Sequence, residues 1–216
     1  MGAEMLGPEN FFAEQLAILE DFLTDPDRSV QVITIDPDLR RLPYIYLGRR
    51  DDDDSFPHIL FGFQEAFTST HDWFARLSAL LQANVDKWRE DLQEIGADVT
   101  IPPVRSGLHT RAWDAWIDRA AHLADSLPDG FGALVFVIDP EDVADAQTWN
   151  ATLKFLGDYT HSPRVKYIVF DPRVHPRLDE ALEHPRVGHQ VFWMSPAEME
   201  RRANEVLIAS QHQRAN

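Results

Sequence analysis

Residues 133–140 read Ala-Leu-Val-Phe-Val-Ile-Asp-Pro, an apolar run that leads directly into an Asp-Pro pair. The same pattern occurs at 30–37 and at 166–172. Short runs rich in Val, Ile and Phe are typical of strands buried on both faces of a sheet, and proline cannot continue the ladder. Helical patterns separate the runs, so we expect a mostly parallel sheet. Its terminal aspartates should lie at the carboxyl edge, where α/β proteins bind ligands.

The remaining hydrophobic periodicity predicts the other elements. Apolar positions three or four residues apart predict helices over 11–23, 70–95, 110–127, 145–156 and 196–210. We also expect strands at 43–47, 59–63 and 189–194, a loop at 48–55 and a short helical piece at 176–182. The sequence therefore predicts a single α/β domain over residues 1–216. It should have three layers, with a mostly parallel sheet of about five or six strands and helices on both faces.

The charge of the chain limits the partners it can have. The 216 residues carry a net charge of -16 and no cysteine. Nucleic acids and anionic lipids bind mainly through Lys and Arg, so neither is an expected partner. The absence of cysteine excludes disulfides, thiolate metal sites and a thiol nucleophile. An acidic surface suits a partner protein with a basic surface, and it suits equally a soluble acidic protein that has no such partner.

The beginning of the sequence shows no targeting pattern. Residues 1–10 lack the basic start and apolar core of a signal peptide. No apolar run approaches the ~20 residues needed to cross a bilayer. We therefore expect a cytoplasmic protein that contacts no membrane.

The stretch from Ala133 to Asp142 resembles the second signature of P-loop ATPases, an apolar strand that ends in an acidic residue or pair. The expected order of elements is also similar to that of AAA+ and related signalling ATPases. This resemblance implies that Asp139 would help to hold Mg²⁺ and that Glu141 would polarise water. The chain departs from the family at 36–43, where the phosphate-binding loop should lie, because that stretch has no glycine and no lysine. The pattern thus indicates an ATPase-like scaffold without its phosphate loop.

Four aspartates allow a second interpretation, a Mg²⁺-dependent enzyme that acts on phosphorylated small molecules. They are Asp36, Asp38, Asp139 and Asp171, and the first two have the Asp-x-Asp spacing of such enzymes. Asp-Pro can also simply begin a turn, with the aspartate capping the next helix. We favour the turn, because no lysine lies at the carboxyl end of a later predicted strand.

Other common site patterns are missing. The run Asp51–Asp54 near His58 is better explained as a solvated loop, because four consecutive carboxylates cannot all face one ion. The nine histidines form no HExxH pair, there is no GxSxG pattern, and the Gly-x-Gly at 130–132 precedes a predicted strand instead of following one. We therefore expect no metal and no cofactor. The leading hypothesis is a non-catalytic intracellular adaptor, chaperone or regulatory protein-interaction domain.

Overall fold

The computed structural model describes residues 12–51, 56–94, 96, 111–195, 197–201 and 204. Within these residues the strands are β1 (Val30–Ile35), β2 (Ile59–Phe63), β3 (Leu134–Ile138), β4 (Val165–Pro172) and β5 (Val187–Phe192). The α-helices are α2 (Ala13–Thr24), α3 (Arg41–Asp51), α4 (Thr70–Lys87), α5 (Arg89–Glu94), α6 (Ala112–Ser126) and α7 (Ala146–Tyr159). Two 3₁₀ turns, η1 (Pro37–Leu39) and η2 (Glu180–Glu183), complete the described elements.

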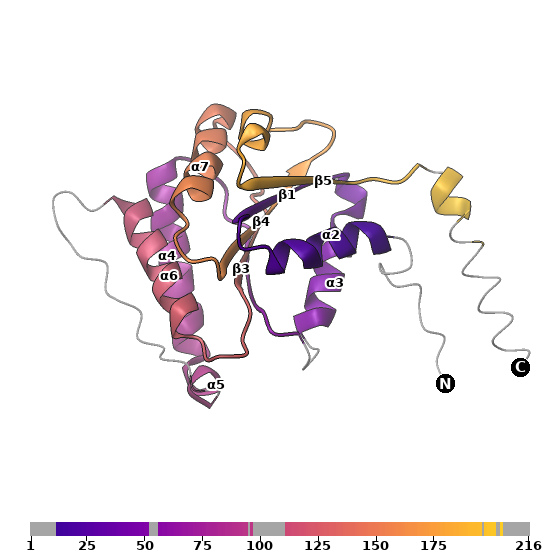
Figure 1. Cartoon of the computed structure of the whole chain (residues 1–216). Helices are drawn as coiled ribbons and strands as arrows, with labels where there is room; N and C mark the ends of the chain where they lie inside the picture. Colours follow the sequence, from indigo (N-terminus) through magenta and orange to yellow (C-terminus); the bar gives the residue numbers. More distant parts are fainter. Residues whose placement is uncertain are drawn as a thin grey trace, which may run out of the picture.

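The strands form one sheet in the order β2-β3-β4-β1-β5, and every neighbouring pair is parallel. Helices α2 and α3 cover one face of the sheet, and α4, α6 and α7 cover the other (Figure 1). This arrangement confirms the predicted three-layer α/β fold with a parallel sheet. None of the helices in the described residues is both long and apolar enough to cross a membrane.

The central strands show why their sequences are continuously apolar. Every residue of β1 and of β3 is buried. Successive side chains of a strand point to opposite faces, so each strand contributes to two cores. In β1, Val30 and Val32 pack toward α4, α6 and α7, whereas Ile33 and Ile35 pack toward α2 and α3.

The strand predicted at 43–47 is wrong, because this segment lies within α3. Pro43 falls in the first turn of the helix, where its missing N–H would have had no helical acceptor. Leu42 and Tyr46, four residues apart, both pack on the core beneath α2. The loop predicted at 48–55 is also wrong at its start, since Gly48 continues the helix. Residues 52–55 lie outside the described part of the chain.

The long helix predicted over 70–95 is interrupted at Trp88. The φ and ψ angles of Trp88 are -101° and 18°, outside helical geometry, and its ring packs 5.5 Å from that of Phe61 on β2. The break between α4 and α5 thus lies at a residue whose side chain packs against the sheet. Ile95 lies outside the described residues.

Smaller differences between the predicted and the observed elements occur in the second half of the chain. Asp171 and Pro172 belong to β4 instead of ending it, and they pair with Thr34 and Ile35. The predicted helical piece at 176–182 is the 3₁₀ turn η2. The strand predicted at 189–194 is β5, shifted toward the N-terminus by two residues. The final predicted helix is present in residues 197–201, and most of its remainder is outside the described chain.

The segments that leave the carboxyl ends of the neighbouring strands β1 and β4 pass over opposite faces of the sheet. The segment from β1 to β2 contains α3 and passes over one face, while the segment from β4 to β5 contains η2 and passes over the other. The carboxyl ends of β1 and β4, which are neighbours in the sheet, therefore form the topological switch point where open α/β sheets bind ligands.

Candidate functional site

Three of the predicted aspartates lie at the carboxyl edge of the sheet, as expected. Asp139 follows β3, Asp171 lies near the end of β4 and Asp36 follows β1, and these strands are neighbours in the order β3-β4-β1. The fourth, Asp38, is exposed in η1, and no hydrogen bond or ion pair found among the described residues joins it to the other three. The edge thus collects three carboxylates from three adjacent strands.

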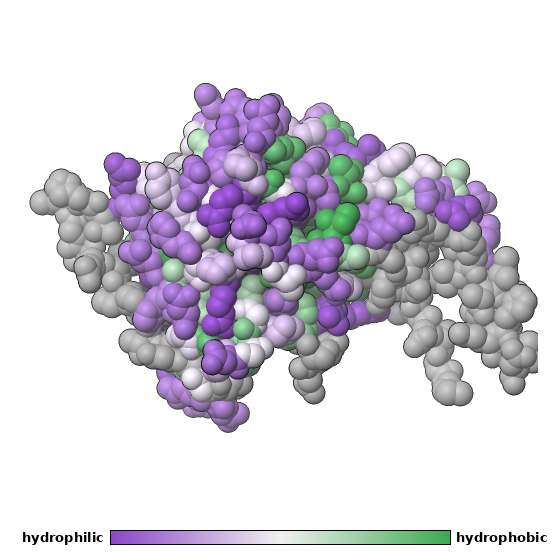
Figure 2. Space-filling view, in the orientation of Figure 1, coloured by the Kyte–Doolittle hydropathy of each residue, from purple (hydrophilic) through white to green (hydrophobic). Residues whose placement is uncertain are grey.

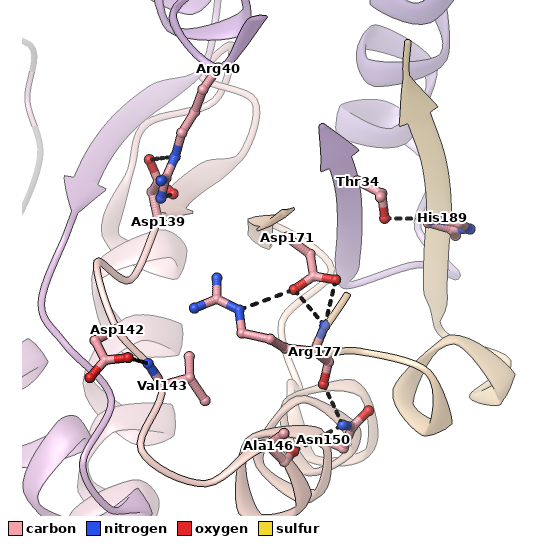
Figure 3. A network of polar contacts seen from close by, with 10 residues as sticks. All are labelled: Thr34, Arg40, Asp139, Asp142, Val143, Ala146, Asn150, Asp171, Arg177 and His189. Atoms are coloured by element: carbon pink, nitrogen blue, oxygen red, sulfur yellow. Dashed lines mark hydrogen bonds and ion pairs between the residues drawn. The ribbon is translucent and has the colours of Figure 1, made fainter. Parts of the chain in front are cut away.

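Each of these carboxylates is bound by an arginine of the same chain. Asp139 pairs with Arg40, Asp171 with Arg177, and Asp36 with Arg173. Figure 3 shows the first two arginines reaching toward their carboxylates from different segments. Arginine binds a carboxylate through a rigid fork of N–H donors, so these pairs neutralise the edge from within.

The carboxylate of the Arg40–Asp139 pair is almost fully buried. The Asp139 side chain is 3% exposed, and its Oδ2 accepts from Arg40 Nε at 2.7 Å. Arg40 Nη2 pairs with the other oxygen, Oδ1, so the contact is bidentate. The Tyr44 hydroxyl donates a third bond, 2.9 Å long, to Oδ2. Burial raises the pKa of Tyr44, so the hydroxyl keeps the proton that it donates.

Asp171 is held by a loop that curls back over it. Its side chain is 1% exposed and accepts from the backbone N–H of Arg177 at 3.0 and 3.2 Å and from Arg177 Nε at 3.3 Å. Burial raises the pKa of Asp171, and the bonds from Arg177 act against that rise. The buried amide of Asn150 on α7 fixes this loop, because it donates to Arg177 O at 2.7 Å (Figure 3). It also accepts from Ala181 N at 2.8 Å.

The Asp36–Arg173 pair is more open to solvent. Arg173 Nε lies 2.8 Å from Asp36 Oδ1, and the Arg173 side chain is 43% exposed. The backbone N–H of Arg173 donates to Ile35 O at 2.9 Å, which places the arginine beside the end of β1. Its guanidinium also lies 5.1 Å from the ring centre of Trp193, a cation–π contact.

Little free space remains at the switch point. A cavity of about 20 Å³ lies between the ends of β1 and β4, next to Ile35 and Phe170, and it has room for about one water molecule. A larger hollow of about 310 Å³ opens over the end of β3. It is lined by Pro37, Arg40, Arg41, Tyr44, Gln64, Asp139 and Glu141.

The residues around this hollow do not fit Mg²⁺ and a nucleotide in the manner of P-loop ATPases. A phosphate cradle needs free backbone N–H groups, but Leu39 N donates to Asp36 O at 2.9 Å, Arg40 N donates to Pro37 O at 3.3 Å, and Pro37 has no N–H. The carboxylate that would face the metal is bound by Arg40. Nowhere in the described ranges do three or more His, Asp or Glu side chains form a group that could hold a metal ion.

His58, considered with the acidic run before it, has a structural contact. Its Nδ1 accepts from Ala133 N at 2.8 Å, which ties the start of β2 to the start of β3. Burial lowers the pKa of His58, which favours the neutral ring that such an acceptor requires. A Cβ on Gly132 would lie 2.6 Å from this ring, so the glycine makes room for the histidine. Residues 52–54 of the acidic run lie outside the described part of the chain.

The sequence interpretation missed the arginines and Tyr44. A usable signal existed for two pairs, because Arg173 and Arg177 follow the Asp171-Pro172 pair within a few residues. Asp139 is followed by Glu141 and Asp142, and its partner Arg40 lies 99 residues away in the sequence. That contact exists only because the end of β3 and the turn after β1 lie at the same edge of the sheet.

Comparison with known proteins finds no family model, no curated protein and no solved structure that matches this chain. The function is therefore inferred from the contacts at the carboxyl edge of the sheet.

Proposed function

We propose that this chain is a non-catalytic protein-interaction domain, an intracellular adaptor, chaperone or regulatory partner in the cytoplasm built on a degenerate ATPase-like scaffold. The proposal is supported chiefly by the three aspartate–arginine pairs at the carboxyl edge. Where a catalytic carboxylate set would need to meet a metal or a substrate, the chain supplies its own cations.

The Arg40–Asp139 pair explains why this edge is a poor metal site. A divalent cation could reach Asp139 only by displacing Arg40, so the free energy of this bidentate pair is subtracted from what the metal contact would gain. Such a site would therefore bind Mg²⁺ weakly, because this ion also gives up its water reluctantly.

The turn after β1 is unfavourable for phosphate. Its amides at Leu39 and Arg40 already donate within the turn, and Asp38 places an exposed carboxylate there. A phosphate group would meet negative charge without a backbone cradle. These features favour a scaffold that no longer binds nucleotide.

The acidic surplus supports recognition of a basic protein surface. The net charge is -16, yet residues 164–216 carry 8 basic and 7 acidic side chains, so the surplus lies in the earlier part of the chain. Opposite charge on a partner would speed encounter, and the effect would weaken as salt screens it. The partner proposed is thus a protein with a basic surface.

A thermal melt tests the proposal against the competing function, a Mg²⁺-dependent enzyme that uses Asp36, Asp38, Asp139 and Asp171. A ligand at a hundredfold its dissociation constant adds about 2.7 kcal/mol of stability, or roughly 5–10 °C for a chain of this size. We expect no shift with Mg²⁺ and ATP, or with Mg²⁺ and inorganic phosphate. A clear rise in Tm with either would contradict the non-catalytic assignment.

Two variants make the melt more informative. Arg40→Ala frees the Asp139 carboxylate, so this variant should be stabilised by millimolar Mg²⁺ or Mn²⁺ more than the wild type is. Arg41→Ala is the matched control, because Arg41 lines the same hollow but has no bond to Asp139. If Arg40→Ala gained no response, the arginine would not be what excludes the metal.

The proposed binding to a basic protein is tested with the partner itself. Purification of the protein from its native cell should bring down a basic protein, and recombinant copies of the two should bind more weakly as salt is raised. The Asp139→Asn variant should bind this partner as the wild type does, whereas an enzyme would lose turnover without losing its fold.

A further inference from the structure

The strands β2 and β5 form the two edges of the sheet, and β5 exposes large side chains next to its edge. Burial alternates along β5: Gln190 and Phe192 are buried, while His189 and Val191 are exposed. Val191 is 44% exposed, and Trp193, just after the strand ends, is 45% exposed. Figure 2 shows hydrophobic residues along β5 on a surface that is otherwise mostly hydrophilic.

The backbone of β5 also has unused hydrogen-bonding groups. Val30 N donates to Arg186 O at 3.3 Å, so Arg186 turns its backbone groups toward β1. Direction alternates along a strand, so Gly188 and Gln190 also face β1, while His189 and Val191 present their N–H and C=O groups to the open edge. No described strand pairs with that edge.

In the part of the chain that the structure describes, this edge lacks the features that usually prevent strand pairing. From Val187 to Ser195 the chain has no Asp, Glu, Lys, Arg or Pro. Edge strands of natural proteins are generally protected by charge, by proline, by a bulge or by a covering element. An uncharged edge of this length can join another strand, and in a chain of net charge -16 it is a place where two copies can meet without opposing carboxylates.

We propose that this edge binds a second copy of the chain, with the two β5 strands antiparallel about a two-fold axis at Val191. In this register Val191 lies opposite Val191 of the second copy, and His189 lies opposite Trp193. Because the backbone groups of Val191 point outward, the central pair would exchange two hydrogen bonds. The two sheets would become one continuous sheet, and the interface would be isologous, as in most homodimers.

The side chains at the edge are held in place for such pairing. His189 Nε2 lies 2.9 Å from Thr34 Oγ1 on β1, and Arg173 stacks on Trp193. Ordered side chains lose little rotamer freedom on association, which favours binding. Beyond β5 the chain runs away from its own body to the helical residues 197–201 (Figure 1). In the antiparallel arrangement this extension would lie against the second copy.

A second copy fits the charge of this edge better than a basic partner does. A basic protein gains nothing from an uncharged strand and would be drawn to the acidic surface elsewhere. Two identical chains repel over distance, but charges more than about 8 Å apart are largely screened at physiological salt. Dimerisation is thus separate from the recognition proposed above, and either can be wrong without the other.

A disulfide test reports the register directly. The chain has no cysteine, so Val191→Cys introduces a single thiol. Directly opposed residues of a hydrogen-bonded antiparallel pair have Cα atoms about 5.5 Å apart, within the range that a disulfide spans. Under mild oxidation we expect a covalent dimer on non-reducing gels. The matched control is Ile45→Cys on α3, a position that is also 44% exposed. Equal cross-linking of the two variants would overturn the register.

Sedimentation equilibrium tests the association itself. The full-length wild type should be a dimer whose dissociation constant falls as salt is raised from low to physiological strength, because salt screens the repulsion of two acidic chains. Val191→Lys should raise that constant at least tenfold, and Ile45→Lys should leave it unchanged. Circular dichroism checks that both variants are folded. A wild type that stays monomeric at every concentration, even if a peptide strand from another protein binds β5, would overturn the proposal.

Discussion

The carboxyl end of β3 and the open edge of β5 are both apolar strand regions, but they leave their polar groups in opposite states. At β3 the Asp139 carboxylate accepts from Arg40 and Tyr44, so the charge that could have bound a ligand is satisfied internally. At β5 the outward backbone groups of His189 and Val191 face an edge with no described neighbour. Buried polar groups must be paired, so the end of β3 contributes to folding, whereas the unpaired groups of β5 are those that we propose to bind a second copy.

The largest expected loss of stability comes from removing Arg40, which binds the Asp139 carboxylate at the end of β3. Arg40→Ala leaves the Asp139 carboxylate buried without its cation and should lower the free energy of unfolding by about 3 kcal/mol. This is the lower end of the range for buried pairs, because the Arg40 side chain is 37% exposed. Urea unfolding at neutral pH measures the loss.

Two controls show whether charge is the cause. The deficit of Arg40→Ala should shrink as pH falls, because protonation removes the unpaired charge. Arg41→Ala should stay within about 0.5 kcal/mol of the wild type. A deficit that does not change with pH would mean that Arg40 acts through packing alone.

A substitution next to the start of β3 should also lower the stability of the protein. Gly132→Ala places a methyl group 2.6 Å from the His58 ring and should cost roughly 1–3 kcal/mol. Combining it with His58→Ala should recover part of that loss, which a double-mutant cycle would measure. Gly48→Ala is the comparison variant, because a Cβ there meets nothing within 4 Å and alanine favours the helix. An uncoupled cycle would contradict the contact between Gly132 and His58.

A pH effect is expected from the amino end of β4. The buried Lys166 ammonium donates to Arg28 O at 2.5 Å and to Asp25 O, and burial lowers its pKa from 10.5 to about 8. Between these values the unfolded chain binds more protons than the folded chain. The free energy of unfolding should therefore rise between pH 8 and 10.5, by an amount on the order of 1–3 kcal/mol. Denaturant unfolding at several pH values measures it, and Lys166→Met should remove this part of the rise.

The smallest effect is expected at Arg173, which pairs with Asp36 after β1 and stacks on Trp193 after β5. Arg173→Ala removes an exposed pair with Asp36 and the stack on Trp193, and should change the stability of the monomer by less than about 1 kcal/mol. Thermal unfolding at low protein concentration measures this change. A loss as large as that of Arg40→Ala would show that both arginines are structural and would remove the contrast between them.

Particular residues show how far the sequence could be interpreted. The Asp-Pro runs located β1, β3 and β4, and the spacing of their apolar residues indicated burial on both faces, because a buried strand needs apolar side chains on both sides. The segment from Pro43 to Leu47 was misassigned, since five apolar and aromatic residues in a row suit a strand and a buried helix turn equally well. The break at Trp88, whose ring packs on Phe61 of β2, interrupts an apolar spacing that continues across it, so helical spacing did not reveal it.

The sequence by itself determined the layers, the parallel sheet and the edge at which the aspartates gather, because these follow from local hydrophobic periods and from the geometry of parallel strands. Only the tertiary structure decided what those aspartates do. Asp139 and Arg40 are 99 residues apart and meet because β4 alone separates β3 from β1 in the sheet. It likewise decided that β5 lies at an edge of the sheet, with Val191 on this strand and Trp193 after it exposed. Which polar groups are satisfied and which are left open depends on long-range neighbours, and no local pattern records them.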